Sequence, residues 1–554
     1  MTFRIFIVSL LAILCLNAGA AESLDFNQCG LIAIQDGGRR KPIDTFAKET
    51  LLRLTGRTSY ATADKTWTAN DFILSILLET HDWKKEPLIL VGYKPLVEEL
   101  GLDAARKKFS YEELATNGKL IGLAEQAQQL EKENKEVARD FKEAESVVGR
   151  MELFAKIARG VAFTIVPSKK DARWLVPSDM EETHKPVLDQ LSAVSSAYVS
   201  KDNFNFNVHA SQLRQMLRQI NPAVYPSETF LKLEYFYNHI SPFDWAAFLY
   251  GIALLGLWIA NSSAGASTLR LGGLTLAVAG LVAHGGGIAM RCIIAGRPPV
   301  TNMFESIVWV SFGVMVFGLL FFARYRALTY LLAALPVSLL CLLLLRQLPV
   351  AMPENIDPLV PVLRSNFWLT IHVLTITLSY AAFALAMGFG HIVLYRFIKN
   401  PATAATNTTL HFWLYRVLQL GVLLLATGTI LGGVWANYSW GRFWGWDPKE
   451  TWALIALLCY IFVIHGRLAG WWDYFGMAVA SVICFCAVMM TWYGVNFVLG
   501  KGLHSYGFGI GGEKYVATFV IFDLSYVALA CVRHRRSVRA SSLSSLHAEV
   551  ALDT

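Results

Sequence analysis

A segment rich in tryptophan and glycine is the part of this sequence whose residue types most clearly indicate chemistry. Trp440, Trp444 and Trp446 are separated by Gly441 and Gly445. Indole rings form flat apolar surfaces, and glycine lets a bound group approach the backbone closely. A belt of interfacial aromatic residues would instead be scattered over many membrane-spanning helices at one depth. The spacing therefore favours a platform for a planar ring system such as a macrocycle.

The residues that follow are typical of the start of a helix. Asp447 suits the N-cap position, Pro448 the first helical position and Glu450 the third. We therefore expect a helix to begin after Asp447, within the tryptophan-rich segment of residues 435–452, which we call the Trp loop.

Two histidines are expected at the depth of the Trp loop. His372 lies near the outer end of a predicted membrane span, and His504 lies in a predicted outer loop. Neutral imidazole is a good ligand for haem iron. Two axial imidazoles would hold a planar ring against the indoles, which makes ligation more plausible than the ordinary role of a packed polar residue.

Three further histidines fall within predicted spans, where an ionisable residue is a functional hypothesis by default. His465 lies near the inner end of its span, and His284 lies in the outer half of another. His391 follows His372 on one predicted helix and lies about 28 Å deeper at 1.5 Å per residue, close to the level of His465.

The elements that must position these residues are membrane helices. Of the 554 residues 54% are apolar or aromatic and 16% are charged, whereas soluble domains average about 45–50% and about 25%. The mean hydropathy is +0.42. Residues 21–241 are polar, and residues 242–532 are almost continuously apolar. The net charge of +7 forms no basic stripe interleaved with aromatics, so we expect no nucleic-acid partner.

Nine hydrophobic spans predict an all-α polytopic membrane protein, because backbone groups inside lipid must be hydrogen-bonded within a helix. The predicted spans are residues 243–260, 269–290, 305–323, 327–345, 367–395, 410–432, 451–466, 473–498 and 515–532.

The N-terminus resembles a secretory signal. Residues 1–21 contain Arg4, a short apolar core and a small-residue exit, although an uncleaved anchor is the alternative. We expect an exported soluble domain at residues 22–240, a membrane domain at 241–533 and a cytoplasmic tail at 534–554. The basic tail fits the positive-inside rule, which places the Trp loop on the outer face of the membrane.

The exported domain is expected to be mostly helical. Leu123, Leu130 and Val137 recur every seven residues, which predicts a long amphipathic helix or a helical hairpin between residues 118 and 158. A helix packed on its own domain is favoured over a partner-binding coiled coil.

No C-x-x-C motif occurs in the sequence, which excludes a thioredoxin-like site and covalent haem attachment to this chain itself.

Several separate motifs resemble one known family. The run Trp440-Gly-Arg-Phe-Trp-Gly-Trp-Asp-Pro-Lys-Glu-Thr-Trp-Ala resembles the WWD signature of haem handling proteins, and more closely the CcsA (ResC) family of system II cytochrome c biogenesis. Phe367-Trp-Leu-Thr-Ile-His372 and Asn496-Phe-Val-Leu-Gly500-Lys-Gly-Leu-His504 resemble the family segments that carry two external histidines. Pro299-Val-Thr-Asn302-Met303-Phe304-Glu305-Ser306 resembles a family loop, P-x-x-N-x-x-E-S.

The resemblance implies haem b as the bound group and places its ligands. His372 and His504 would be axial ligands at an outer site against Trp440, Gly441, Trp444, Gly445, Trp446 and Asp447. His465 would be a ligand in the membrane, on the route by which haem enters. In the family the partner histidine there belongs to a CcsB (ResB) part. This chain lacks the full set of CcsB spans, and only its exported domain and first predicted helix resemble that part. His391, His284 or a separate subunit would then supply it.

The implied function is delivery of haem for thioether attachment to C-x-x-C-H motifs of apocytochrome c, as a possible subunit of a cytochrome c synthase. It implies as partners a CcsB/ResB-like subunit, apocytochrome c, a thiol-reducing protein and the lipid membrane. From their charge and placement alone, Arg442 and Lys449 would pair with haem propionates. The alternatives are a b-type cytochrome or quinone electron-transfer protein, with histidines paired on facing helices, and a haem exporter without covalent chemistry.

Overall fold

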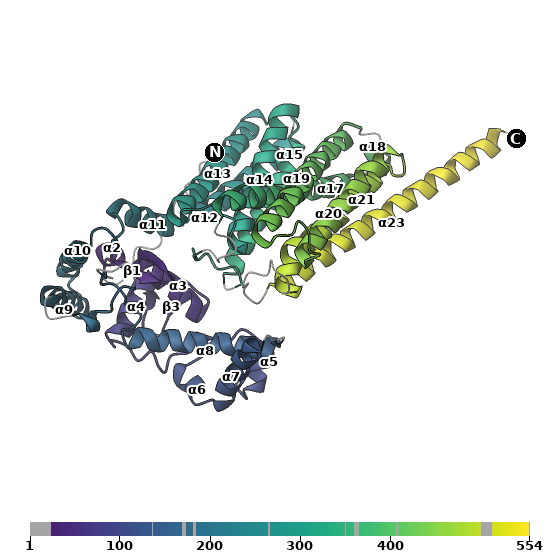
Figure 1. The fold of residues 1–554 in the computed structure, drawn as a ribbon. Coiled ribbons are helices and arrows are strands. Elements are labelled where there is room, and N and C mark those ends of the chain that lie inside the picture. Colours follow the sequence, from purple (N-terminus) through teal and green to yellow (C-terminus); the bar gives the residue numbers. More distant parts are fainter. Residues whose placement is uncertain are drawn as a thin grey trace. The chain divides into compact units, whose positions relative to one another are not determined.

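A computed structural model of the chain describes residues 24–552 except 134, 136, 169–172, 181–183, 264–265, 350, 359–364, 406–407 and 500–511. The predicted signal peptide and His504 lie outside the described residues. The chain divides into two compact units between Phe236 and Tyr237 (Figure 1).

The first unit is mostly helical and also contains three two-stranded antiparallel sheets. Its elements are α2 (Asn27–Gly30), β1 (Ala33–Asp36), β2 (Arg39–Pro42), α3 (Ile43–Thr55), β3 (Ser59–Ala61), β4 (Thr66–Thr68), α4 (Ala69–Leu77), β5 (Ile89–Leu90), α5 (Lys94–Glu99), β6 (Lys108–Phe109), α6 (Tyr111–Ala115), α7 (Gly118–Lys132), α8 (Arg139–Ala158), the 3₁₀ turn η1 (Pro177–Asp179), α9 (Lys185–Val199), α10 (Asn203–Ile220) and α11 (Glu228–Ile240).

A β-hairpin and a helical hairpin lie in this unit. Strands β1 and β2 form the tight β-hairpin, and helices α7 and α8 form the helical hairpin predicted between residues 118 and 158. β1 pairs with β2 from Ala33 opposite Pro42 to Asp36 opposite Arg39, and Gly37 and Gly38 supply the two positive φ angles of a type I′ turn. Helices α7 and α8 pack against each other. Apolar side chains of both hairpins belong to one hydrophobic core in this unit.

The second unit consists of helices. Its elements are α12 (Pro242–Ser262), α13 (Ser267–Ala295), α14 (Met303–Tyr325), α15 (Thr329–Gln347), α16 (Asn366–Trp368), the π-helical segment η4 (Leu369–Val373), α17 (Leu374–Lys399), α18 (Pro401–Ala405), α19 (Thr408–Trp440), α20 (Pro448–Leu468), α21 (Tyr474–Ile483), α22 (Phe485–Met489), the π-helical segment η5 (Met490–Leu499) and α23 (Glu513–Leu552). Among the described residues, nine helices are long and apolar enough to cross a membrane, which confirms the predicted polytopic α-helical fold.

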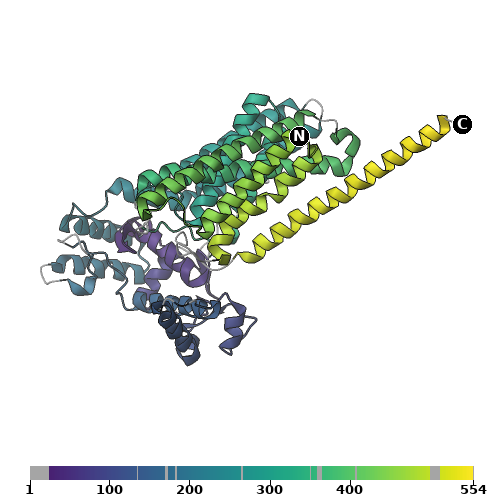
Figure 2. The ribbon, with the colours of Figure 1, turned by 45° about the vertical axis from the view of Figure 1, so that its right-hand side comes forward.

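Helix α17 is the central helix of this bundle. It packs against α14, α15, α19, α21 and α23. Its residues from Ser379 to Met387 are all buried, as expected for a helix that is apolar on every side. Helix α23 is far more exposed, and Figures 1 and 2 show it diverging from the other helices toward its C-terminal end.

Two π-helical segments interrupt the α-helices of this unit: η4 lies directly before α17, and η5 lies directly after α22. η4 contains His372, and η5 contains Asn496. A π-helical turn widens the helix locally and often occurs at functional sites.

Candidate functional site

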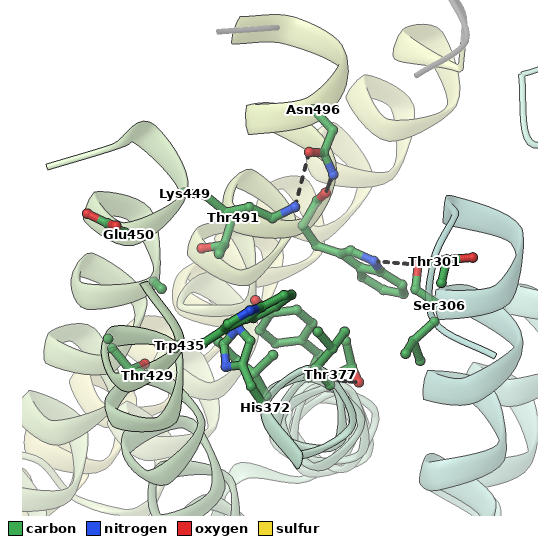
Figure 3. Close-up of a pocket in the computed structure, with 18 of the residues that line it drawn as sticks. Thr301, Ser306, His372, Thr377, Thr429, Trp435, Lys449, Glu450, Thr491 and Asn496 are labelled. Atoms are coloured by element: carbon green, nitrogen blue, oxygen red, sulfur yellow. Dashed lines mark hydrogen bonds between the residues drawn. The ribbon is translucent and has the colours of Figure 1, made fainter. Parts of the chain in front are cut away.

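A pocket opens beside the Trp loop in the second unit (Figure 3). It encloses about 1070 Å³ of empty space, counting its open mouth. Its walls come from five segments: the residues before and within the start of α14, the η4–α17 junction, the end of α19, the Trp loop with the start of α20, and η5. Most of the lining is apolar or aromatic, and a few polar groups converge on it, which is the composition of a small-molecule site.

His372 reaches this pocket with a defined tautomer. Its Nδ1 lies 2.8 Å from the carbonyl oxygen of Gly428 on α19. A carbonyl oxygen only accepts, so Nδ1 donates its hydrogen and Nε2 carries the ring's lone pair. Metal-binding histidines are typically oriented by such a bond from their second nitrogen.

Glycines on α19 make room for this imidazole. A Cβ atom at Gly432 would lie 2.7 Å from Cε1 of His372, closer than real Cβ contacts allow. The indole of Trp435, one turn further along α19, lies 5.7 Å from the imidazole, centroid to centroid (Figure 3). The Nε1–H of Trp435 is buried and has no hydrogen-bond partner among the described residues. A buried donor without a partner at a pocket wall is consistent with a missing ligand.

The start of α20 is confirmed as predicted. Asp447 is the N-cap, Pro448 is the first helical residue, and Glu450 completes a capping box. One carboxylate oxygen of Glu450 accepts from the backbone N–H of Gly445 at 2.8 Å and of Asp447 at 3.2 Å. The other lies 3.3 Å from the guanidinium of Arg442. Glu450 therefore fixes the shape of the Trp loop.

The three tryptophans of the motif have different surroundings. Trp444 lines the pocket, and its ring meets that of Trp446 edge to face at 5.8 Å. Trp446 is 69% exposed and has a positive φ of 58°, which is unfavourable for a residue with a bulky side chain. Trp440 ends α19, and the guanidinium of Arg442 lies 5.6 Å from its ring. Gly441 follows with φ 69°.

The wall opposite His372 carries a polar pair. Lys449 Nζ donates to Asn496 Oδ1 at 3.2 Å, and Figure 3 shows both side chains across the pocket from His372. Trp492 donates from Nε1 to the hydroxyl of Ser306 at 3.2 Å, which ties η5 to α14. Lys449 thus lines the pocket, whereas Arg442 is paired with Glu450.

A buried ion-pair network holds the segment before α14. Glu305 is fully buried and accepts from Arg291 at 3.0 Å and from Arg297 at 2.9 Å. It also accepts from the backbone N–H and the hydroxyl of Thr301. Asn302 caps α14 through its side chain. Thr301 and Asn302 line the pocket, so this network positions that wall.

His284 and His391 are not among the residues that line the pocket. His284 is buried; its Nε2 donates to the carbonyl of Val308 at 3.0 Å, and its Nδ1 is 3.3 Å from the hydroxyl of Tyr250. His391 has Nδ1 bonded to its own helix backbone and Nε2 3.1 Å from Oδ1 of Asp523 on α23.

His465 differs from these two. It is exposed on α20, and its Nδ1 donates to the carbonyl of Ile461 at 2.9 Å. Its Nε2 therefore carries the lone pair, as in His372. His372 and His465 share this tautomer. The Nε2 atoms of His284 and His391 contact the carbonyl of Val308 and the carboxylate of Asp523.

Sequence reasoning missed several residues that build the pocket. Gly428 and Gly432 lie on a span that was expected only to cross the membrane. Trp435 was counted only as the first residue of the Trp loop, whereas the structure places it on α19, and Asn496 was quoted only as part of a motif. The sequence did contain a signal for this contact. Gly428, Gly432 and Gly433 precede Trp435, and small residues in a membrane helix indicate that a neighbour packs closely against it.

The chain is similar to cytochrome c assembly proteins. Residues 300–504, which include the Trp loop, match a family model described as cytochrome C assembly protein. The cytochrome c biogenesis protein CcsA of Guillardia theta is 34% identical over 246 residues, which are 40% of this chain and 80% of that protein. CcsA of Synechococcus sp. (strain CC9902) is 32% identical over 302 residues, 48% of this chain and 96% of that protein.

A longer match extends outside the membrane helices. Protein NrfI of Wolinella succinogenes is 31% identical over 505 residues, 85% of this chain and 53% of NrfI. The chain thus spans about half the length of NrfI. Because the match is longer than Tyr237–Thr554, it continues into the first unit.

Proposed function

Because the chain belongs to the CcsA family and acts in cytochrome c assembly, we propose that its pocket at the Trp loop holds haem b for thioether attachment to the C-x-x-C-H motif of apocytochrome c. Haem is the substrate in this proposal, and it brings the reactive vinyl groups. The protein contributes binding and orientation.

The tautomer of His372 is the observation that carries the proposal. Its Nδ1 is bonded to Gly428, so Nε2 is the atom suited to bind iron. The surrounding pocket is lined by Trp435 and Trp444, which suit a flat apolar ring. Lys449, on the opposite wall, is placed to meet an acidic substituent of that ring.

The remaining members of the outer site follow from the family. His504, outside the described residues, is proposed as the second axial ligand. Trp440, Gly441, Gly445 and Trp446 would support the ring together with Trp444, and Asp447 would act indirectly, by starting α20 where the loop ends.

A second site is proposed at His465. Its tautomer matches that of His372, and its ring is exposed on the surface of the described bundle. A ligand on the outside of the bundle suits a site completed by another subunit, which supports a CcsB/ResB-like partner. His391 and His284 are weaker candidates, since their Nε2 atoms already contact Asp523 and Val308.

The membrane arrangement is proposed from the sequence. Residues 22–240 and the Trp loop would lie on the outer face of a bacterial inner membrane, with a cytoplasmic tail at 534–554. The thiols of the apocytochrome must be reduced to react, so a thiol-reducing partner would act on the same face.

Absorption spectra of the purified full-length protein test this function. His372→Ala, His504→Ala and His465→Ala should each lose reduced-haem absorption, and His209→Ala, in the first unit, should not. Added imidazole should restore part of the signal in His372→Ala. Unchanged spectra in all three ligand variants would contradict the ligand assignment.

Co-expression with an apocytochrome that carries C-x-x-C-H separates synthesis from the alternatives. Covalent haem on that reporter, lost in His372→Ala, supports the proposal. A redox-active haem protein without covalent product would instead indicate electron transfer, and release of free haem would indicate export.

A further inference from the structure

A second pocket lies at the opposite ends of α19 and α20 from the Trp loop. It is lined by the first turns of α19, the last residues of α20 and the start of α21, and encloses about 1090 Å³ of empty space, counting its open mouth. These helix ends are also the ends of predicted membrane spans, Thr409–Trp440 and Pro448–Leu468. The pocket therefore lies at the depth of a membrane surface.

His411 is a buried polar side chain in the wall of this pocket. It is 1% exposed, and its Nε2 lies 3.3 Å from the carbonyl oxygen of Ala404. Its Nδ1 is buried without a hydrogen-bond partner among the described residues. The ring stacks on Tyr474 at a centroid distance of 4.0 Å and an interplanar angle of 5°, so packing holds the imidazole in place.

Arg467 adds a positive charge to the same wall. Its guanidinium lies 4.9 Å from the ring of Tyr474. Among the described residues it makes no ion pair, and the nearby carboxylate of Asp473 instead accepts from the backbone N–H of Gly476 to cap α21. A half-buried guanidinium beside a cavity suits an anionic ligand, because charge-assisted hydrogen bonds to a phosphate are among the strong ones.

The rim of the pocket is apolar. Phe412 is 42% exposed and Leu468 is 71% exposed, and both line the cavity. The guanidinium of Arg416 lies 4.7 Å from the ring of Phe412. A cationic interior with an apolar rim matches a ligand that joins an anion to an apolar body.

We propose that this pocket binds the phosphate of an anionic phospholipid headgroup. Arg467 would hold the phosphate by charge-assisted hydrogen bonds. Because Nε2 of His411 donates to Ala404, its Nδ1 carries the lone pair and would accept from a hydroxyl of the headgroup. Phe412 and Leu468 would contact the glycerol and upper acyl region. A free phosphate has no apolar part that could contact Phe412 and Leu468. A zwitterionic headgroup carries a positive charge that Arg467 would repel.

Native mass spectrometry of the detergent-purified full-length chain tests the proposal. Dioleoylphosphatidylglycerol, dioleoylphosphatidylcholine and inorganic phosphate are titrated separately, and retained adducts are counted. Arg467→Gln should weaken phosphatidylglycerol binding about ten-fold, and Arg467→Lys should weaken it less. Arg324→Gln is the matched control, because Arg324 also lies over a tyrosine ring, Tyr325, at the end of a span; it should leave binding unchanged.

His411→Phe provides a second variant in case Arg467→Gln does not fold. It keeps an aromatic ring against Tyr474 but removes the acceptor, so it should also lower phosphatidylglycerol binding. Equal effects of Arg467→Gln and Arg324→Gln would overturn the site. Phosphatidylcholine bound as tightly as phosphatidylglycerol would overturn the anionic specificity, and inorganic phosphate competing equally with phosphatidylglycerol would overturn the lipid assignment.

Discussion

The imidazole of His372 is bonded through Nδ1 to the carbonyl oxygen of Gly428, 56 residues further along the chain and 2.8 Å away. The bond joins η4 to α19 and directs Nε2 rather than Nδ1 to any ligand. The orientation of this histidine thus depends on how closely α19 can approach it.

Gly432→Ala should disturb that approach without weakening the helix. The added methyl would lie 2.7 Å from Cε1 of His372, so the ring must move, while alanine favours helix over glycine. We expect about a ten-fold loss of haem affinity, the usual effect of disturbing the group that orients a metal ligand. Haem titration measures it. Gly286→Ala, where an added Cβ meets nothing within 4 Å, is the control and should bind haem normally.

Glu305→Ala should destabilise the membrane unit strongly. It leaves Arg291 and Arg297 buried without their carboxylate, at a cost of about 3–5 kcal/mol. Thermal unfolding in detergent measures the loss. Glu152→Ala breaks an exposed ion pair with Lys156 and should cost about 0.5 kcal/mol or less. Similar losses in the two variants would contradict a structural role for the Glu305 network.

Glu450→Ala should loosen the Trp loop. The variant removes the acceptor of the Gly445 and Asp447 backbone N–H groups and the partner of Arg442. Loss of a capping interaction costs about 0.5–2 kcal/mol. We expect faster proteolysis within residues 441–447, with Glu450→Gln closer to the wild type because an amide oxygen still accepts. Unchanged cleavage in Glu450→Ala would show that other contacts fix the loop.

His391→Ala should affect stability more than haem binding. Its removal leaves the buried carboxylate of Asp523 without the imidazole, at a cost of about 1–3 kcal/mol. Because Nε2 of His391 already faces Asp523, haem content per folded molecule should match the wild type, unlike that of His465→Ala. A loss of haem equal to that of His465→Ala would instead make His391 a ligand.

The elements of the fold were predictable because their signals are local. Each confirmed element depends on residues that are neighbours in the sequence. These elements are the nine apolar spans, the helical hairpin at 118–158 and the capping box of Asp447 and Glu450. Span length follows from membrane thickness, and capping follows from the geometry of one helical turn.

The contacts of the site were not predictable in the same way. The Gly428 partner of His372 and the Asp523 partner of His391 lie on other helices. Which face of an apolar helix meets which neighbour depends on the packing of the whole bundle, because such helices have no polar side to orient them. The π-helical turn at His372 further rotates the ring from the position that a regular helix gives.

The left-handed backbone at Trp446 lowers the stability of the folded protein. Left-handed geometry costs a non-glycine residue about 1–2 kcal/mol, so selection for thermal resistance alone would favour glycine at this position. Trp446→Gly would relax the backbone and at the same time delete a large exposed indole. The ring is 69% exposed and gains little burial to offset this cost, which fits its proposed role in supporting a bound ring system.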